Sequence, residues 1–296
     1  GSVRQNLKFN TLEKIKIPLP SIDEQHRIVS QYNQKLKQVK IQELEAKKLE
    51  KKIEEYLINE LGIKDIKHSK PKVGLQLVDY KNIFDWSLKT DNTKFQSSDY
   101  EVLSLEKQPS LYKDIFRGKS PKYDMEGTKY ILNQKCNKWN HIELRYAKNI
   151  NDKWFNSIDK KFFTEKGDVL INSTGNGTIG RATHISEDFK NLIYDSHLLL
   201  LKLNKEKVNS IYFTYLFNSK YGQMQIENIK SAQSTNQTEL GVSNIKKIIF
   251  PLPPLKLQNQ IANHIQDLNN QIENLLNKLK TDKVTALKQL EEQVFN

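Results

Sequence analysis

The sequences IKIPLP at residues 15–20 and IIFPLP at residues 248–253 are near copies, and each runs directly into a long helical pattern. They are separated by 233 residues, from Pro18 to Pro251. A strand-like run, a proline break and a helix therefore occur twice, with one large domain between the copies. The further pairs that match at this spacing are Leu12 with Ile245, Lys14 with Lys247, Ile22 with Leu255, Gln25 with Gln258 and Ile28 with Ile261.

The first long helix is expected to lie between Ser21 and Gly62. Ser21 followed by Glu24 has the form of a capping box, in which two side chains accept hydrogen bonds from free backbone N–H groups. Gly62 can take the left-handed conformation that closes a helix. Apolar residues recur every seven positions, which predicts a narrow coiled-coil seam. The members of this seam are Tyr32, Val39, Ala46 and Ile53, with Ile28, Leu36, Leu49 and Leu57 nearby.

The second long helix shows alternating steps of four and three residues, followed by a predicted change of phase after Leu279. Pro254 takes the place of the serine, so no capping box is expected there. Because a closed domain separates the two helices, they should lie side by side and antiparallel. The first seam comprises Ile261, Ile265, Leu268, Ile272, Leu275 and Leu279, and the shifted seam comprises Leu287, Leu290 and Val294.

The 296 residues carry 47 Lys and Arg against 35 Asp and Glu, a net charge of +12 that favours a polyanionic partner. The single cysteine, Cys136, excludes an internal disulfide framework and any cysteine-rich zinc site, which points to the cytoplasm. No apolar run approaches the length of a membrane span, so no membrane partner is expected.

The pattern changes between the helices, where aromatic, β-branched and turn residues replace the heptads. We expect an α+β protein, with one mixed α/β domain and two long helices in an antiparallel coiled coil. The expected parts are residues 1–20 (the end of a preceding domain or its linker), 21–62 (first helix), 63–244 (central domain) and 245–296 (linker strand and second helix). Expected strands are 102–105, 129–132, 168–172, 182–185 and 198–203, and expected helices are 211–218 and 221–229.

The sequence patterns that could indicate catalysis are not supported by the residues around them. Residues 175–180, GNGTIG, match a dinucleotide fingerprint, but a returning strand follows where the fingerprint requires a helix. Gly118-Lys119-Ser120 lacks the earlier glycine of a phosphate-binding loop. The histidines have no metal-ligand spacing, and His197 beside Ser196 and Asp195 is better explained as an ordinary strand residue. A methyltransferase motif is also missing. The sequence therefore predicts a binding protein, not an enzyme, with no cofactor or metal of its own.

Basic and polar residues beside turns are the candidates for DNA contact, because Arg reads guanine, Asn or Gln reads adenine, and Lys and Ser hold phosphates. They fall into four groups along the chain. The groups are Arg117, Lys119, Lys122 and Tyr123; Lys138, Trp139 and Arg145; Ser173, Thr174, Asn176, Thr178 and Arg181; and Ser234, Thr235 and Gln237 in the polar run 231–239, which could equally be a plain linker.

Several features in this order resemble the DNA specificity (S) subunit of type I restriction-modification enzymes. They are the proline-containing starts of both helices, Gly118-Lys119-Ser120-Pro121, the run 167–171 before the glycine-rich turn, Ser196-His197-Leu198, and Tyr212 to Tyr221-Gly222. The resemblance covers essentially the whole chain.

The resemblance implies a non-catalytic subunit whose target recognition domain reads one half of a split site in double-stranded DNA. It further implies methyltransferase (M) partners that hold S-adenosylmethionine, and a restriction or motor (R) partner that uses ATP. The sequence departs from the family pattern in having both helices but one recognition domain. Two explanations remain open: a fragment of a longer subunit, or a half subunit that forms a homodimer.

Two other functions remain to be distinguished. A coiled-coil scaffold with a protein-binding head would show little salt dependence toward DNA, whereas phosphate contacts weaken steeply as salt rises. A dinucleotide-dependent enzyme built on the glycine-rich turn would be stabilised against heat by NAD or a flavin.

Overall fold

The structure is a computed structural model that describes residues 16–64, 96–231 and 239–295. The chain divides into two compact units. Unit 1 contains residues 1–52 and 267–296, and unit 2 contains residues 53–266, so the division falls within both long helices, α2 (Ile22–Glu60) and α7 (Leu255–Phe295). In the described ranges, no helix combines the length and apolar character needed to cross a membrane.

Helix α2 begins and ends where the sequence predicts. The Ser21 Oγ accepts a hydrogen bond from the Glu24 backbone N–H at 3.3 Å. The Glu24 carboxylate bonds the Arg27 guanidinium at 2.8 Å, so one half of the predicted capping box is formed. At the other end Gly62 has φ +53°, and Ile63 N–H donates to the carbonyl of Ile58. This is a Schellman closure, which requires the left-handed residue that glycine supplies.

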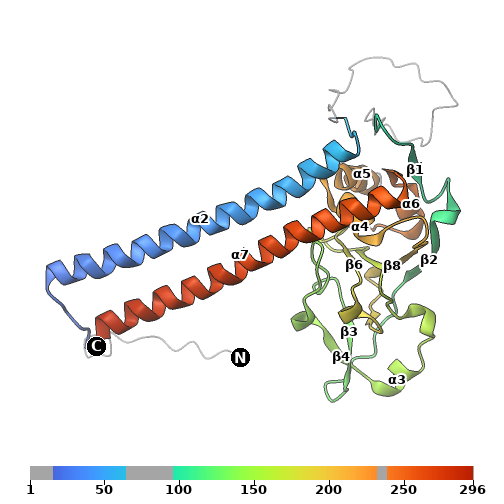
Figure 1. The fold of residues 1–296 in the computed structure, drawn as a ribbon. Helices are drawn as coiled ribbons and strands as arrows, with labels where there is room; N and C mark the ends of the chain where they lie inside the picture. The colour runs from blue at the N-terminus through green and yellow to red at the C-terminus, as the bar shows by residue number, and fades with distance from the viewer. Residues whose placement is uncertain (1–15, 65–95, 232–238, 296) are drawn as a thin grey trace, which may run out of the picture. The chain divides into compact units, whose positions relative to one another are not determined.

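Within unit 1, α2 and α7 run antiparallel (Figure 1). Rising numbers on α2 pair with falling numbers on α7: Gln31 with Gln293 at 2.9 Å, and Gln42 with Asp282 at 2.9 Å. Lys283 also donates to Glu43 at 2.8 Å. The predicted seven-residue seam on α2 is confirmed, since Val39, Ala46 and Ile53 are all buried.

The predicted change of phase on α7 is wrong at Leu287, whereas Leu290 and Val294, the other members of the shifted seam, are half-buried. Ile272, Leu279 and Ala286 are buried at unbroken steps of seven, whereas Leu287 is 50% exposed. The sequence pattern assigns the larger residue Leu287 to the seam and does not include the neighbouring Ala286. A small apolar side chain still fits a helix seam, because it lets the two backbones approach closely.

In its described residues, unit 2 contains three small sheets, and it confirms the mixed fold class. An antiparallel four-stranded sheet has the order β2-β8-β5-β6, a three-stranded sheet has the order β4-β3-β7, and β1 pairs with β9. The strands are β1 (Val102–Ser104), β2 (Tyr112–Arg117), β3 (Lys129–Leu132), β4 (Lys148–Ile150), β5 (Val169–Asn172), β6 (Ala182–His184), β7 (Ile193–Tyr194), β8 (Leu198–Leu203) and β9 (Ile249–Pro251).

Helices α4, α5 and α6 gather at one end of unit 2 and α3 lies at the opposite end, and α4 packs against both α5 and β6 (Figure 1). A buried apolar cluster joins the two larger sheets, with Leu132 and Tyr194 from one and Leu170 and Leu200 from the other. The α-helices are α3 (Asp152–Asn156), α4 (Ser210–Asn218), α5 (Lys220–Ser231) and α6 (Val242–Lys247), and the 3-10 helices are η2 (Pro109–Leu111), η3 (Leu144–Tyr146), η4 (Lys160–Phe162) and η5 (Glu187–Phe189).

All five strands and both short helices expected from the sequence are present, with ends that shift by up to two residues. In the described residues, three further strands, β2, β4 and β7, and the short helices α3 and α6 are not predicted by the sequence. Strand β2 reads YKDIFR, in which charged residues interrupt the apolar alternation. It is held by its antiparallel ladder to the apolar strand β8, a long-range pairing without a local signal.

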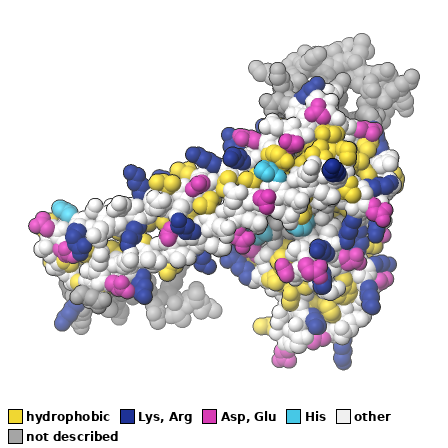
Figure 2. Space-filling model, viewed as in Figure 1, with side chains coloured by type: hydrophobic (Ala, Val, Ile, Leu, Met, Phe, Trp, Pro, Cys, Tyr) yellow, Lys and Arg dark blue, Asp and Glu magenta, His cyan; other side chains and the backbone are white. Residues whose placement is uncertain are grey.

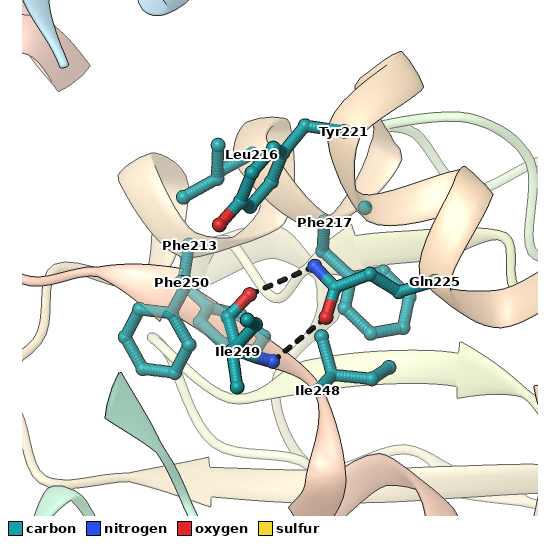
Figure 3. A pocket seen from close by; sticks show the side chains of 9 residues that line it. Phe213, Leu216, Phe217, Tyr221, Gln225, Ile248, Ile249 and Phe250 are labelled. Carbon is teal, nitrogen blue, oxygen red and sulfur yellow. Dashed lines mark hydrogen bonds between the residues drawn. The ribbon is translucent and has the colours of Figure 1, made fainter. Parts of the chain in front are cut away.

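The second copy of the repeat is anchored to unit 2 by β9 (Figure 3). The Gln225 side chain donates to the Ile249 carbonyl and accepts from the Ile249 N–H, both at 2.8 Å. The Tyr212 hydroxyl donates to the Pro251 carbonyl at 2.7 Å, and Phe250 is 2% exposed with its ring against Phe213. These contacts fix the start of α7 on this unit.

Candidate nucleic-acid interface

The glycine-rich segment is a tight turn between two antiparallel strands, as the sequence predicts. Strand β5 ends at Asn172, residues 173–181 form the turn, and β6 returns beside β5. Gly175, Gly177 and Gly180 all have positive φ, a backbone conformation that favours glycine. The geometry of the turn therefore accounts for these glycines, and a nucleotide-binding role is not needed to explain them. Asn176 is exposed, whereas Thr178 Oγ1 donates back to Thr174 O at 3.2 Å. The turn therefore presents Asn176 outward from a rigid base.

The structure brings Arg181 and Trp139 together from separate loops. The Arg181 guanidinium lies 5.7 Å from the centre of the Trp139 ring, and its Nη2 donates to the Gly177 carbonyl at 3.0 Å. Trp139 is 43% exposed. A guanidinium held on an aromatic face keeps its remaining donors oriented in one plane. This arrangement suits a planar hydrogen-bonding partner such as a base edge.

Arg117 and Ser173 support the turn from its other side. The Arg117 guanidinium forms an ion pair with Glu239 and donates to Ser196 O at 3.2 Å. Ser173 is fully buried, and its Oγ donates to the Leu240 carbonyl at 3.0 Å. The expectation that Ser173 contacts DNA is therefore wrong for this conformation. Its short side chain satisfies backbone groups inside the fold.

Thr174 and Lys119 both contact the short segment that precedes β8. Thr174 Oγ1 is 2.7 Å from His197 Nδ1, so the His197 side chain forms a hydrogen bond with the turn. Lys119 forms a backbone bridge with Asp195, and its Nζ lies 3.8 Å above the Phe162 ring. Burial raises the pKa of the Asp195 carboxyl, although a hydrogen bond from the His197 N–H opposes the shift.

Lys122 and Tyr123 are exposed in a separate, firmly held loop. Asn151 N–H donates to Lys122 O at 2.9 Å, and the Lys148 Nζ lies 4.9 Å from the Tyr123 ring centre. Burial and the nearby Asp195 charge raise the pKa of the Tyr123 hydroxyl. The side chain of Lys148 was not among the predicted contacts, because only the fold places it beside Tyr123.

Lys138 and Arg145 meet at one acidic side chain, Glu143. Arg145 Nε donates to Glu143 Oε2 at 3.0 Å, and Lys138 Nζ lies 3.8 Å from the same oxygen. Both cations also lie over the Tyr146 ring, at 4.5 and 4.8 Å. The remaining predicted contacts, Ser234, Thr235 and Gln237, lie outside the described residues.

Basic and acidic side chains are mixed on the visible face of the molecule. On the face shown in Figure 2, Lys and Arg side chains are interspersed with Asp and Glu, without one continuous basic patch. Among the described residues, no group of three or more His, Cys, Asp or Glu is placed to hold a metal ion.

Comparisons with known proteins place this fold and these loops in one family. Residues 100–281, more than half of the chain, match the protein-family model described as the type I restriction modification DNA specificity domain. The chain belongs to this family of DNA specificity subunits. Such subunits are non-catalytic, so the family gives the chain no enzymatic role.

Two curated relatives carry the same description. Over 109 residues the chain is 34% identical to the putative type I restriction enzyme MjaX specificity subunit of Methanocaldococcus jannaschii, a match to 36% of this chain and 25% of that protein. Over 113 residues it is 29% identical to the type I restriction enzyme StySPI specificity subunit of Salmonella potsdam, covering 37% of this chain and 24% of that protein. The matches thus span about a quarter of each relative's length.

Solved structures share the fold. A chain from a study of complex assembly and conformational transition in a type I restriction-modification system matches 94% of this chain and 60% of its own, with TM-score 0.55 and 16% identity. The S subunit from M. genitalium matches 100% of this chain and 67% of its own, with TM-score 0.53 and 16% identity. At this identity, the likeness concerns the fold alone.

Proposed function

We propose that this chain reads one half of a split DNA site through the loops of unit 2, and that it brings methyltransferase subunits to that site. The observation that supports base reading most directly is the Arg181 guanidinium on the Trp139 ring, beside the exposed Asn176. A stacked arginine and a projecting amide are the side-chain types that recognise guanine and adenine edges. The neighbouring lysines would hold phosphates and supply affinity without sequence preference.

The geometry of the two loops supports a preformed reader. The buried Asn137 amide donates to the Arg181 carbonyl at 3.1 Å and to Asn172 Oδ1 at 2.9 Å. Asn218 Nδ2 donates to Asn140 Oδ1 at 2.6 Å and also to Ala182 O. These bonds tie the 137–140 loop to the returning strand β6. Little side-chain ordering would then be needed when DNA binds, and lower ordering cost favours affinity.

The second half of the site requires a second recognition domain, for which the repeat offers a docking segment. Gln258 donates to Pro253 O at 2.9 Å, and the matching Gln25 donates to Pro20 O at 2.8 Å. Gln258 also accepts from the Asn209 N–H in the recognition domain. Among the exposed apolar residues, Ile17, Leu19 and Ile22 are 75%, 83% and 69% exposed, whereas Phe250, the counterpart of Ile17, is buried.

The experiment for base reading compares the wild-type protein with Arg181→Ala. Methylation mapping in cells that carry the complete system would first identify the site. Binding to that site and to mixed-sequence duplex is then measured at several salt concentrations. We expect Arg181→Ala to cost about 1–3 kcal/mol at one base position, if the arginine makes a two-bond contact. Arg27→Ala, which removes the same charge on α2, should retain wild-type preference.

Three results would count against this function. The first is a wild-type protein that, with its methyltransferase partner, prefers no duplex over random competitors. The second is DNA binding that is insensitive to salt, which would favour the protein-binding scaffold. The third is an Arg181→Ala protein with unchanged preference, which would remove this residue from the reading surface. A cytoplasmic location follows from this proposal, since the substrate is cellular DNA.

A further inference from the structure

Glu143 lies at the meeting point of three basic side chains. Arg145 contacts its Oε2 through both Nε and Nη2 at 3.0 Å, Lys138 Nζ is 3.8 Å from that oxygen, and His141 Nε2 is 3.7 Å from Oε1. Desolvation raises the pKa of Glu143, but the bonds and charges of Arg145, Lys138 and His141 outweigh it and lower the pKa overall. The carboxylate is therefore ionised at neutral pH.

The cations converge on Glu143 because the loop that carries them is fixed. Glu143 N–H donates to Cys136 O at 2.8 Å, and Lys138 N–H donates to His141 O at 3.0 Å. Thr183 Oγ1, on strand β6, donates to Lys138 O at 3.0 Å. The cluster is consequently built onto the same strand and loop that position Arg181 and Trp139. The cluster is therefore part of the candidate interface because it shares these supporting contacts, and not only because it is basic.

The cluster is also open to solvent on its basic side. The side chains of Arg145 and His141 are 70% and 60% exposed, whereas those of Glu143 and Lys138 are 28% and 23% exposed. Exposed ion pairs add little to stability, so folding gives weak reason for this arrangement. A carboxylate and a phosphate accept the same charge-assisted hydrogen bonds from Arg and Lys.

We propose that Glu143 is an internal competitor for a DNA backbone phosphate. In the free protein its carboxylate occupies the donors of Arg145 and Lys138, and a phosphate must displace it. This competition lowers affinity for every duplex by the same factor, so the ratio of affinities between duplexes still depends on base contacts elsewhere. Glu143 would thus control the strength and the salt dependence of phosphate binding without touching a base. The inference rests on the proposed DNA-reading function.

The test is Glu143→Gln in the full chain, with anisotropy measured on a labelled mixed-sequence duplex across a salt series. We expect affinity for this duplex to rise several-fold. The slope of log affinity against log salt should steepen by about 0.9, the value for one added phosphate contact. The ratio of affinities for the mapped site and mixed sequence should stay at the wild-type value, because the gain applies equally to both duplexes while base contacts stay the same.

Three further variants test whether the effect depends on the position of the removed charge or only on the change in net charge. Glu187→Gln makes the same change in net charge at an exposed ion pair with Lys190, and should leave the slope at the wild-type value. In an Arg145→Gln background, Glu143→Gln should give little further gain, because the masked donor is gone. Glu143→Ala removes the same carboxylate without adding an amide, and must also steepen the slope.

The proposal is overturned if the Glu143 variants bind mixed-sequence duplex equally or more weakly than the wild type, or if Glu187→Gln gives the same gain. A weaker variant would mean that Glu143 only holds the basic side chains in position. These outcomes leave the reading function intact. Conversely, a wild-type protein without sequence preference would contradict that function, while the salt slopes would still report on the phosphate site.

Discussion

Asn137 shows how single buried residues organise the candidate interface. Its side-chain amide donates toward Leu170 O, Asn172 Oδ1 and Arg181 O from a fully buried position. A buried amide that loses its partners is costly, so these contacts hold both loops in one arrangement. The sequence interpretation named the exposed neighbours, Lys138 and Trp139, as contacts. It gave no role to Asn137, since burial cannot be read from a polar residue in a turn.

A residue-scale prediction concerns His184 on β6, whose Nδ1 is buried without a hydrogen-bond partner. Burial lowers the pKa of His184 in the folded protein. In the unfolded chain the pKa of a histidine is about 6.5, so as pH falls the unfolded state takes up a proton on His184 before the folded state does. Stability should be fully present above that value and decrease as pH drops toward the lower folded pKa.

His184→Leu should therefore lose less thermal stability than the wild type between about pH 7.5 and pH 5.5. Melting temperatures at the two pH values measure this difference. His26→Gln removes an exposed histidine from α2 and should follow the wild type. If the melting temperatures of His184→Leu and the wild type decrease by the same amount between the two pH values, protonation of His184 does not contribute to acid sensitivity.

At the scale of elements, the Gln42–Asp282 hydrogen bond fixes the register of α2 and α7 in unit 1. Gln42 is 4% exposed in an otherwise apolar seam, with its Oε1 lacking a partner in the described structure. A single polar residue in a seam commonly sets register at a cost in stability. The heptads predicted that the helices pair, whereas this contact determines which turns face each other.

We expect the pair Gln42→Cys and Asp282→Cys to form an intramolecular disulfide on mild oxidation, seen by mobility on a non-reducing gel. Gln42→Cys with Gln289→Cys moves the second position one heptad, about 10 Å along the helix, and should not cross-link. The native Cys136 is buried and should not interfere. Equal cross-linking of both pairs would contradict a fixed register.

At the scale of the whole molecule, the repeat predicts a partner for its first copy. The second copy is anchored by β9 and Gln258, while the first copy leaves Ile17, Leu19 and Ile22 exposed in the described structure. Because Gln25 and Gln258 form the same bond to a preceding proline carbonyl, we propose an equivalent partner for the first copy. A second recognition domain, from a longer chain or from a second copy, fits that requirement.

Leu19→Glu should therefore weaken recruitment of a second recognition domain and lower methylation of the bipartite site several-fold. Methylation mapping in cells carrying the complete system measures this. Val284→Glu places the same charge at an exposed apolar position of α7 and should have a smaller effect. Methylation that is equally reduced in both variants would indicate a general loss of assembly, not docking of a second domain.

The sequence alone determined the repeat, both long helices with their ends, the mixed class of the central domain and the glycine-rich turn. These features depend on local chemistry: caps, heptads, and glycines with positive φ. The tertiary structure decided the pairing of β2 with β8, the continuous seam through Ala286, the burial of Ser173, and the meeting of Arg145 with Glu143. Each of these depends on packing or on contacts that only folding creates, and side-chain type alone does not specify them.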